Sequence, residues 1–179
     1  MTNRKEDPNR ALISFDDPIT KHTPQADLMQ RGQNHVQSYQ TAAAHLGQAV
    51  AALNARDYLG AIDAFQEALQ HNRESAEGHF YLGLSYFMVG DYENAVASYK
   101  QAITCEPGDP TIYLNLGIVQ QLLKRYDAAI RSYQQAIVLG PNNAEAYSQL
   151  GSAYAAQGKR QEAVAAYKEA IRVKLLLND

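Results

Sequence analysis

Apolar and small residues follow a helical period along most of the chain. The segment 76–109 shows the pattern most clearly, with one stripe in each half: Leu82, Gly83 and Tyr86, then Ala95, Tyr99 and Ala102. Spacings of one, three and four residues place each stripe on one face of an α-helix. Gly90-Asp91 interrupts the pattern, and residues 106–109 close it. The segment therefore predicts two helices joined by a tight turn.

The same pattern returns every 34 residues. It gives four units, 42–75, 76–109, 110–143 and 144–177, which together make up 136 of the 179 residues. The outer units depart from it: Gln48 replaces the Leu of its column, and Arg73 and Leu175 replace the Pro. A fixed period of this length indicates a repeat array, whose core is a continuous seam between stacked units.

Residues that favour helix starts recur with the same period. Thr41, Ser75, Asp109 and Asn143 are 34 residues apart, and each is a good N-cap residue. Pro110 follows Asp109 at the favoured first helical position. The next place in the series is Leu177, which cannot cap a helix. We therefore expect the array to end with the fourth unit.

Three glycines stand in the middle of the first helix of their units: Gly83, Gly117 and Gly151. Glycine inside a helix costs ~1 kcal/mol relative to alanine, so we expect a close approach of a neighbouring backbone at these positions. Alanine columns on the second helices agree, and a large residue at Ala95 should overpack the seam by ~1–3 kcal/mol. The prediction is an all-α fold of nested helix pairs.

This combination of period and internal spacing resembles the tetratricopeptide repeat (TPR) family. His45, His79, Tyr113 and Tyr147 stand where the pattern of that family has Trp. The resemblance implies a right-handed superhelical solenoid of four helix-turn-helix repeats. It also implies that the first helices of successive units line a concave groove.

Two segments precede the array. Residues 1–25 are polar and contain Pro8, Pro18 and Pro24, so we expect an extended or disordered leader unless it docks. Residues 26–41 return to a helical pattern that Gly32 weakens. They form either a capping helix or an extension of the first helix of the array.

Composition excludes several classes of protein. The net charge of −3 is too small to indicate nucleic acid or a membrane surface as a partner. Residues 42–109 carry a net charge of −6 and residues 110–179 one of +3, which fits either solvated helix faces or head-to-tail steering. Cys105 is the only cysteine, and no run of 18 apolar residues or secretion signal occurs. We expect a cytoplasmic protein without an integral membrane segment, either free or at the periphery of a membrane complex.

The sequence contains no recognisable catalytic arrangement. Its five histidines lack the spacing of metal ligands, and no phosphate-binding loop or hydrolase motif occurs. We therefore expect no catalytic residue, no metal and no cofactor.

The columns expected to face the groove carry a second apolar stripe in the first three units. The candidate partner-binding residues are Phe80, Tyr81, Leu84, Phe87, Met88, Leu114, Asn115, Ile118 and Leu122. Some of them could instead pack helix against helix inside the array. If they remain accessible, the protein is a non-catalytic adaptor or assembly scaffold that binds a peptide or helix with ~micromolar affinity.

One branch of the family holds the carboxyl terminus of chaperones with a clamp of Lys, Asn and Arg. Here Phe80, Leu84, Leu114 and Ile118 occupy places of the clamp, and Asn115 is the one match. We expect no binding of chaperone tails.

Two further modes of association remain open. Leu175, Leu176 and Leu177 replace the polar turn of the last unit, so they could support a homo-oligomer or fold back on the last seam. A self-assembling structural protein that stacks through its end faces is the alternative function. The apolar cluster Leu12, Ile13 and Phe15 in the leader could also dock in the groove.

Overall fold

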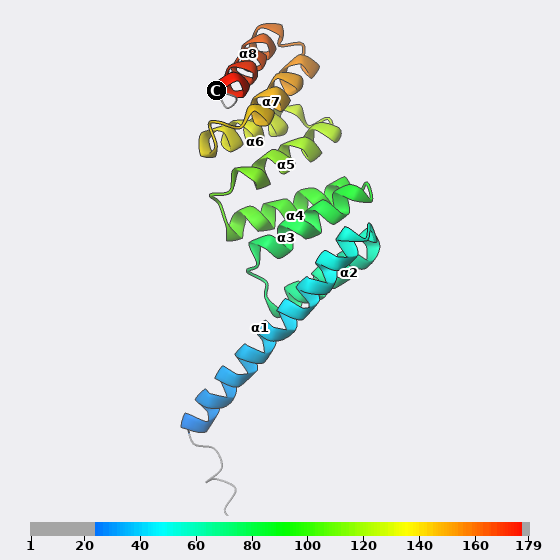
Figure 1. Ribbon diagram of the computed structural model, residues 1–179, viewed down its shortest axis with the longest axis vertical. Coiled ribbons are helices and arrows are strands. Elements are labelled where there is room, and N and C mark those ends of the chain that lie inside the picture. Colours follow the sequence, from blue (N-terminus) through cyan, green and yellow to red (C-terminus); the bar gives the residue numbers. More distant parts are fainter. Residues whose placement is uncertain (1–23, 177–179) are drawn as a thin grey trace, which may run out of the picture. The chain divides into compact units, whose positions relative to one another are not determined.

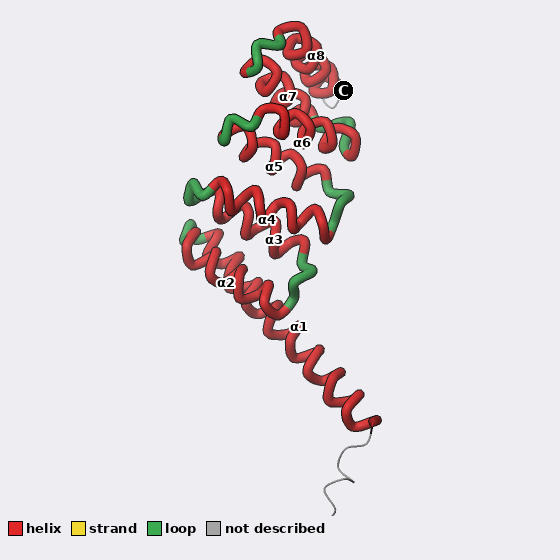
Figure 2. The backbone as a smooth tube through the Cα atoms, turned by 180° about the vertical axis from the view of Figure 1, so that it is seen from behind, coloured by secondary structure: helices red, strands yellow, loops and turns green. Residues whose placement is uncertain are grey.

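The computed structural model describes residues 24–176, and this part of the chain consists of eight helices and short turns, without a strand (Figures 1 and 2). The helices are α1 (Pro24–Asn54), α2 (Tyr58–His71), α3 (Ala76–Met88), α4 (Tyr92–Cys105), α5 (Pro110–Leu122), α6 (Tyr126–Leu139), α7 (Ala144–Ala156) and α8 (Arg160–Leu176). By its internal contacts the chain divides into residues 1–37 and residues 38–179. The boundary falls within α1.

Within residues 38–179, successive helices pack as antiparallel hairpins, and each hairpin packs on the next. Helices α3 and α4, α5 and α6, and α7 and α8 form pairs, and α2–α3, α4–α5 and α6–α7 join the pairs. Ala49 of α1 packs with Ala61 and Phe65 of α2, so the first unit follows the same plan. The predicted all-α solenoid of four helix-turn-helix repeats is confirmed.

Helix α1 covers both the segment 26–41 and the first helix of the first unit. Pro24 and Gln25, which we assigned to the leader, already belong to α1. The expected N-cap Thr41 is wrong, because it lies inside α1 rather than before a helix. No proline or turn sequence interrupts residues 25–53, so nothing ends the helix before it reaches the array.

The other predicted caps are confirmed. The side chains of Ser75, Asp109 and Asn143 accept hydrogen bonds from the backbone N–H groups of Gly78, Thr111 and Ala146, at 3.0, 2.7 and 3.0 Å. Each bond satisfies one of the free N–H groups of a helix start and fixes where α3, α5 and α7 begin.

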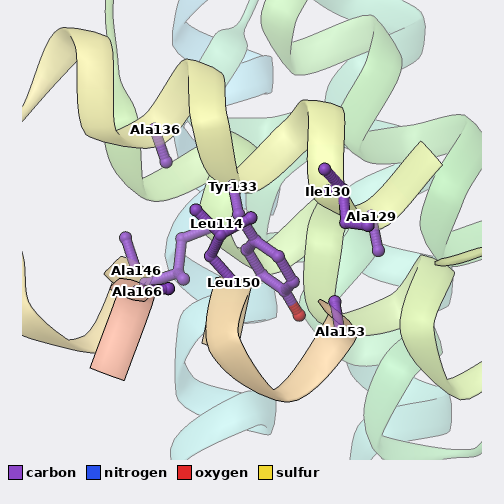
Figure 3. Close-up of a cluster of buried hydrophobic side chains, with 9 residues drawn as sticks. All are labelled: Leu114, Ala129, Ile130, Tyr133, Ala136, Ala146, Leu150, Ala153 and Ala166. Atoms are coloured by element: carbon purple, nitrogen blue, oxygen red, sulfur yellow. The ribbon is translucent and has the colours of Figure 1, made fainter. Parts of the chain in front are cut away.

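Tyrosine rings fill the seams that the mid-helix glycines open. A Cβ at Gly117 would lie 2.5 Å from Cε1 of Tyr133, and one at Gly83 would lie 2.9 Å from Cδ1 of Tyr99. Tyr133 is fully buried at the centre of the cluster that joins α5, α6 and α7 (Figure 3). The close approach at these glycines therefore comes from a tyrosine ring of the second helix, and not from its backbone as we expected.

The turn inside each hairpin needs one residue in the left-handed region. Gly90 and Gly158 have φ of +82° and +77°, which glycine adopts without strain. Arg56 and Lys124 occupy the same place in the first and third units, with φ of 61° and 57°. The backbone of the turn is therefore conserved through all four units even where glycine is absent.

Candidate partner-binding surface

The candidate residues fall on the first helices of the second and third units. We define the α3–α5 face as Phe80, Tyr81, Leu84, Phe87, Met88, Asn115, Ile118 and Leu122, the first five on α3 and the others on α5. Phe80 and Tyr81 of α3 and Ile112 of α5 line one crevice, so the two helices that carry the face meet there.

The aromatic residues of this face are partly engaged in packing. The ring of Phe80 lies 5.3 Å from that of Tyr81 and 5.8 Å from that of Tyr99. Tyr81 in turn stacks on Phe65, and Phe87 lies 6.1 Å from Tyr92. These contacts hold the rings in fixed positions, but all three side chains stay only half-buried.

Exposure separates the candidate residues into two groups. Met88 and Leu122 are 45% and 49% exposed, and Leu84 and Ile118 are half-buried. Leu114 is only 6% exposed, because its side chain lies in the cluster around Tyr133 (Figure 3). Leu114 therefore supports the seam, and the accessible apolar surface comes from the other positions.

Crevices open beside the first helices of the first, second and fourth units, and the fifth residue of the unit lines each of them. Leu46 lines a crevice of about 170 Å³ in the first unit, and Phe80 one of about 210 Å³ in the second. In the fourth unit Ser148 takes this place, and the crevice reaches about 710 Å³. The crevice in the fourth unit is thus larger than those in the first and second units, where the following helix adds residues to the lining.

The crevice beside Phe80 is lined by apolar and by acidic side chains, which we call its apolar floor and its acidic rim. Phe80, Tyr81 and Ile112 contribute aromatic and aliphatic surface. The rim carries three carboxylates and no basic side chain: Glu77, Glu106 and Asp109. Glu77 and Glu106 are exposed, so a basic group that approaches this end of the α3–α5 face meets negative charge from two sides.

Polar groups replace the apolar stripe toward the fourth unit. Oε1 of Gln121 accepts a hydrogen bond from the Tyr133 hydroxyl at 3.1 Å, and its Nε2 donates to Ser152 at 3.0 Å. Gln121 thus links α5 to both α6 and α7. Phe87 occupies the place of Gln121 in the second unit, and the buried hydroxyl of Tyr99 has no hydrogen-bond partner among the residues described. Burial raises the pKa of both tyrosines, and the charge of Glu145 adds to the effect at Tyr133.

The sequence prediction names the apolar residues of the face but not the carboxylates of the rim. Glu77, Glu106 and Asp109 come from a helix start, a helix end and a cap, which are 32 residues apart at most. Only the packing of one hairpin on the next brings them together. The signal available in the sequence was the excess of acidic residues in the first two units.

Among residues 24–176, no group of three or more His, Cys, Asp or Glu side chains could hold a metal ion. Within the same residues, no helix is both long and apolar enough to cross a bilayer.

Known protein families match most of the chain. Models described as tetratricopeptide repeat match residues 34–71 and 46–110, 98–131 and 144–174, and a model described as TPR repeat matches residues 122–158. The matches together extend from residue 34 to residue 174. No curated protein matches the chain.

Several solved structures share the arrangement of helices. A "Crystal structure of MamA protein" is 28% identical, covers 75% of this chain and 73% of that chain, and superposes with a TM-score of 0.73. A second "Crystal structure of MamA" is 22% identical, covers 88% and 98% of the two chains, and has a TM-score of 0.76. The structure described as "First TPR of Spaghetti (RPAP3) bound to HSP90 peptide SRMEEVD" is 19% identical, covers 67% and 95%, and has a TM-score of 0.65.

Proposed function

Because the chain belongs to the tetratricopeptide repeat family, whose fold it shares, we propose that it is a non-catalytic adaptor or assembly scaffold that binds a protein segment on the α3–α5 face. The observation that carries the proposal is the apolar floor and acidic rim beside Phe80. The partner segment is apolar at two or more positions and bears Lys or Arg beside them.

The apolar part of the face supplies the affinity. Met88 and Leu122 occupy the same place in neighbouring units and expose close to half of their surface. Burying a large apolar side chain contributes ~1.5–3 kcal/mol, and ordering two molecules offsets much of the sum. Three or four such contacts are consistent with a dissociation constant of ~1–100 μM.

The rim supplies the selectivity. One similar TPR structure is described as bound to the peptide SRMEEVD, which has three acidic residues. The present face has Glu77, Glu106 and Asp109 at its crevice, which would repel such a peptide. A segment of opposite charge would gain from the same carboxylates, and its binding would weaken with added salt.

Selection from a random peptide library tests the proposal. Peptides that bind the wild type are expected to combine apolar residues with a net positive charge. They should bind the double variant Met88→Glu/Leu122→Glu at least ~10-fold more weakly, because a charge then faces the apolar segment. The matched control is Leu59→Glu/Val138→Glu, which makes the same change at exposed apolar residues on α2 and α6.

Charge reversal at the rim separates the two parts of the site. Glu77→Lys/Glu106→Lys should weaken the basic peptides by ~10-fold without changing the fold, because both side chains are exposed. Two results would rule out this site. One is that the selected peptides are acidic; the other is that they bind Met88→Glu/Leu122→Glu and Glu77→Lys/Glu106→Lys with the same affinity as the wild type. A chain without residues 1–23 serves as a further arm: tighter binding would mean that the leader, with Leu12, Ile13 and Phe15, competes for the face.

A further inference from the structure

One face of α8 is more exposed than its counterparts in the other three units, which are buried or half-buried. We define the tail face as Val164, Tyr167 and Ile171, which are 52%, 38% and 60% exposed. The residues 34 positions earlier are Ile130, Tyr133 and Ile137, of which the first two are 7% and 0% exposed and the third is half-buried. The same residue types therefore stand on α8 without the contacts that they have on α6.

The cover in the inner units is the first helix of the following unit. In the third unit, α6 is covered by Ala146, Leu150 and Ala153 of α7, which share one core cluster with Ile130 and Tyr133 (Figure 3). In the second unit, Ile112, Leu116 and Val119 of α5 cover α4 in the same way. A helix with small or aliphatic residues at the third, seventh and tenth positions of its unit is thus the natural partner of this face.

Helix α1 presents such a surface at the other end of the array. We define the head face as Ala44, Gln48 and Ala51, which hold the third, seventh and tenth positions of the first unit. All three are exposed, whereas their counterparts on α5 and α7 are buried. The head face has Ala-Gln-Ala where α7 has Ala-Leu-Ala. Its shape therefore suits the surface that the second helix of a unit, such as α6, presents to the following unit.

We propose that the head face of one copy docks on the tail face of a second copy, so that the 34-residue stacking continues from chain to chain. The interface has the geometry of the α6–α7 contact, with α1 of the second copy in the place of α7. Because the two surfaces differ, the contact is head-to-tail and leaves one of each free for further copies. The association is independent of partner binding on the α3–α5 face.

The opening beside the tail face supports this occupant. The crevice of about 710 Å³ is lined by Ser148 of α7 and by Tyr167, Ile171 and Lys174 of α8. In the first and second units the corresponding crevices are about 170 and 210 Å³, and there the following helix adds Gly78, or Thr111 and Ile112, to the lining. Ala43 and Ala44 of a docked copy correspond to Thr111 and Ile112 in the repeat, so they would line the crevice of the fourth unit and close the opening.

The lengths of the two end helices also fit. Helix α8 has 17 residues, whereas α2, α4 and α6 have 14 each. Its extra turn carries Leu175 and Leu176, which are 62% and 63% exposed. Helix α1 extends beyond the head face through Tyr39, which is 51% exposed. Antiparallel docking sets these two extensions side by side and buries apolar groups that an inner unit does not possess.

Charge favours contact between unlike ends. Residues 42–109 carry a net charge of −6, and residues 110–179 carry +3. Lys168 and Lys174 lie on α8 next to the tail face, while Asp57 caps α2 in the first hairpin and Asp63 lies within that helix. Two like ends repel each other, so the field disfavours a closed symmetric dimer and favours the head-to-tail contact.

Sedimentation velocity of the whole chain tests the proposal with one variant for each end. The tail variant is Val164→Glu/Ile171→Glu, and the head variant is Gln48→Lys/Ala51→Lys. The wild type should sediment faster as its concentration rises from ~1 to ~200 μM, and each variant should stay monomeric because association weakens at least ~10-fold. Leu59→Glu/Val138→Glu is the control and should associate like the wild type.

Mixing the two variants gives the sharper result. Each retains one intact face, so an equimolar mixture should form pairs and nothing larger. A wild type that is monomeric at every concentration would overturn the proposal and assign the tail face to a leader segment or to a different protein. Association of the head variant alone would overturn it too, in favour of a tail-to-tail dimer. Circular dichroism and urea titration confirm that each variant folds.

Discussion

Replacing Gly117 by alanine measures how tightly the hairpins are nested. The new Cβ would lie 2.5 Å from Cε1, 2.7 Å from Cδ1 and 3.0 Å from Cζ of Tyr133. Non-bonded carbon atoms prefer to lie ~3.5–4 Å apart, so the ring must move by ~1 Å. Tyr133 is fully buried, and Gln121 holds its hydroxyl, so the ring has little freedom to retreat. We expect a packing cost near ~3 kcal/mol, the upper end of the range for overpacked cores.

Gly47→Ala is the matched control for this substitution. Gly47 lies within α1, and an added Cβ there meets no atom within 4 Å. Alanine should therefore stabilise the helix by up to ~1 kcal/mol. Both changes replace glycine by alanine in a helix, so the propensity gain is common to them. The difference of ~3 kcal/mol between the variants then reports the packing cost alone.

Gly151→Ala provides an intermediate case. The added Cβ would lie 2.8 Å from the ring of Tyr167, which is 38% exposed and can turn outward. Its cost should be lower than that of Gly117→Ala. Urea titration followed by circular dichroism gives the three midpoints. If Gly117→Ala unfolds at the same urea concentration as Gly47→Ala, the close nesting of ring and glycine does not determine the packing, and the reasoning fails.

Two further predictions concern equivalent positions of different units, and a third concerns the crevice beside Phe80. Tyr133→Phe should lower the free energy of unfolding by ~0.5–1.5 kcal/mol because it removes the bond to Gln121, whereas Tyr99→Phe should leave it unchanged or raised, since that hydroxyl has no partner in the described structure; equilibrium urea unfolding compares the two. Gly90→Ala should cost ~1–2 kcal/mol and Lys124→Gly should stabilise the protein, because both residues adopt positive φ; thermal unfolding would contradict this if both variants shifted in the same direction. The peptide SRMEEVD should not bind more tightly than ~10 μM in calorimetry, because the crevice beside Phe80 is acidic; tighter binding would restore the chaperone-tail function that the sequence disfavours.

The period of the sequence predicted the architecture well, for a physical reason. Each unit can bury its apolar stripe only against a neighbour, so Gly117 and Tyr133 had to recur in register with their counterparts. The caps Ser75, Asp109 and Asn143 act locally, within three residues, and were therefore readable as well. Thr41 misled the prediction because capping requires a break in the preceding helix, and the helix simply continues through it.

The surface was less predictable than the core. Whether Leu114 or Leu122 is accessible depends on how far one hairpin is rotated over the next, and the column pattern is the same for both outcomes. The acidic rim and the uncovered face of α8 arise from contacts between units, or from their absence, and not from any local motif. The polar positions Gln121 and Ser152 were visible in the sequence, but their link to Tyr133 was not.

Under the proposed function, the fifth residue of a unit gives that unit its own share in recognising the partner. Leu46, Phe80 and Ser148 sit at equivalent points, and each lines the crevice of its own unit. Since a unit touches only its neighbours, exchanging one of these side chains would change a single crevice and leave the others as they are. A ligand lying along the array would thus contact each unit separately. The ligand preference of the protein could then be changed one unit at a time, by single substitutions.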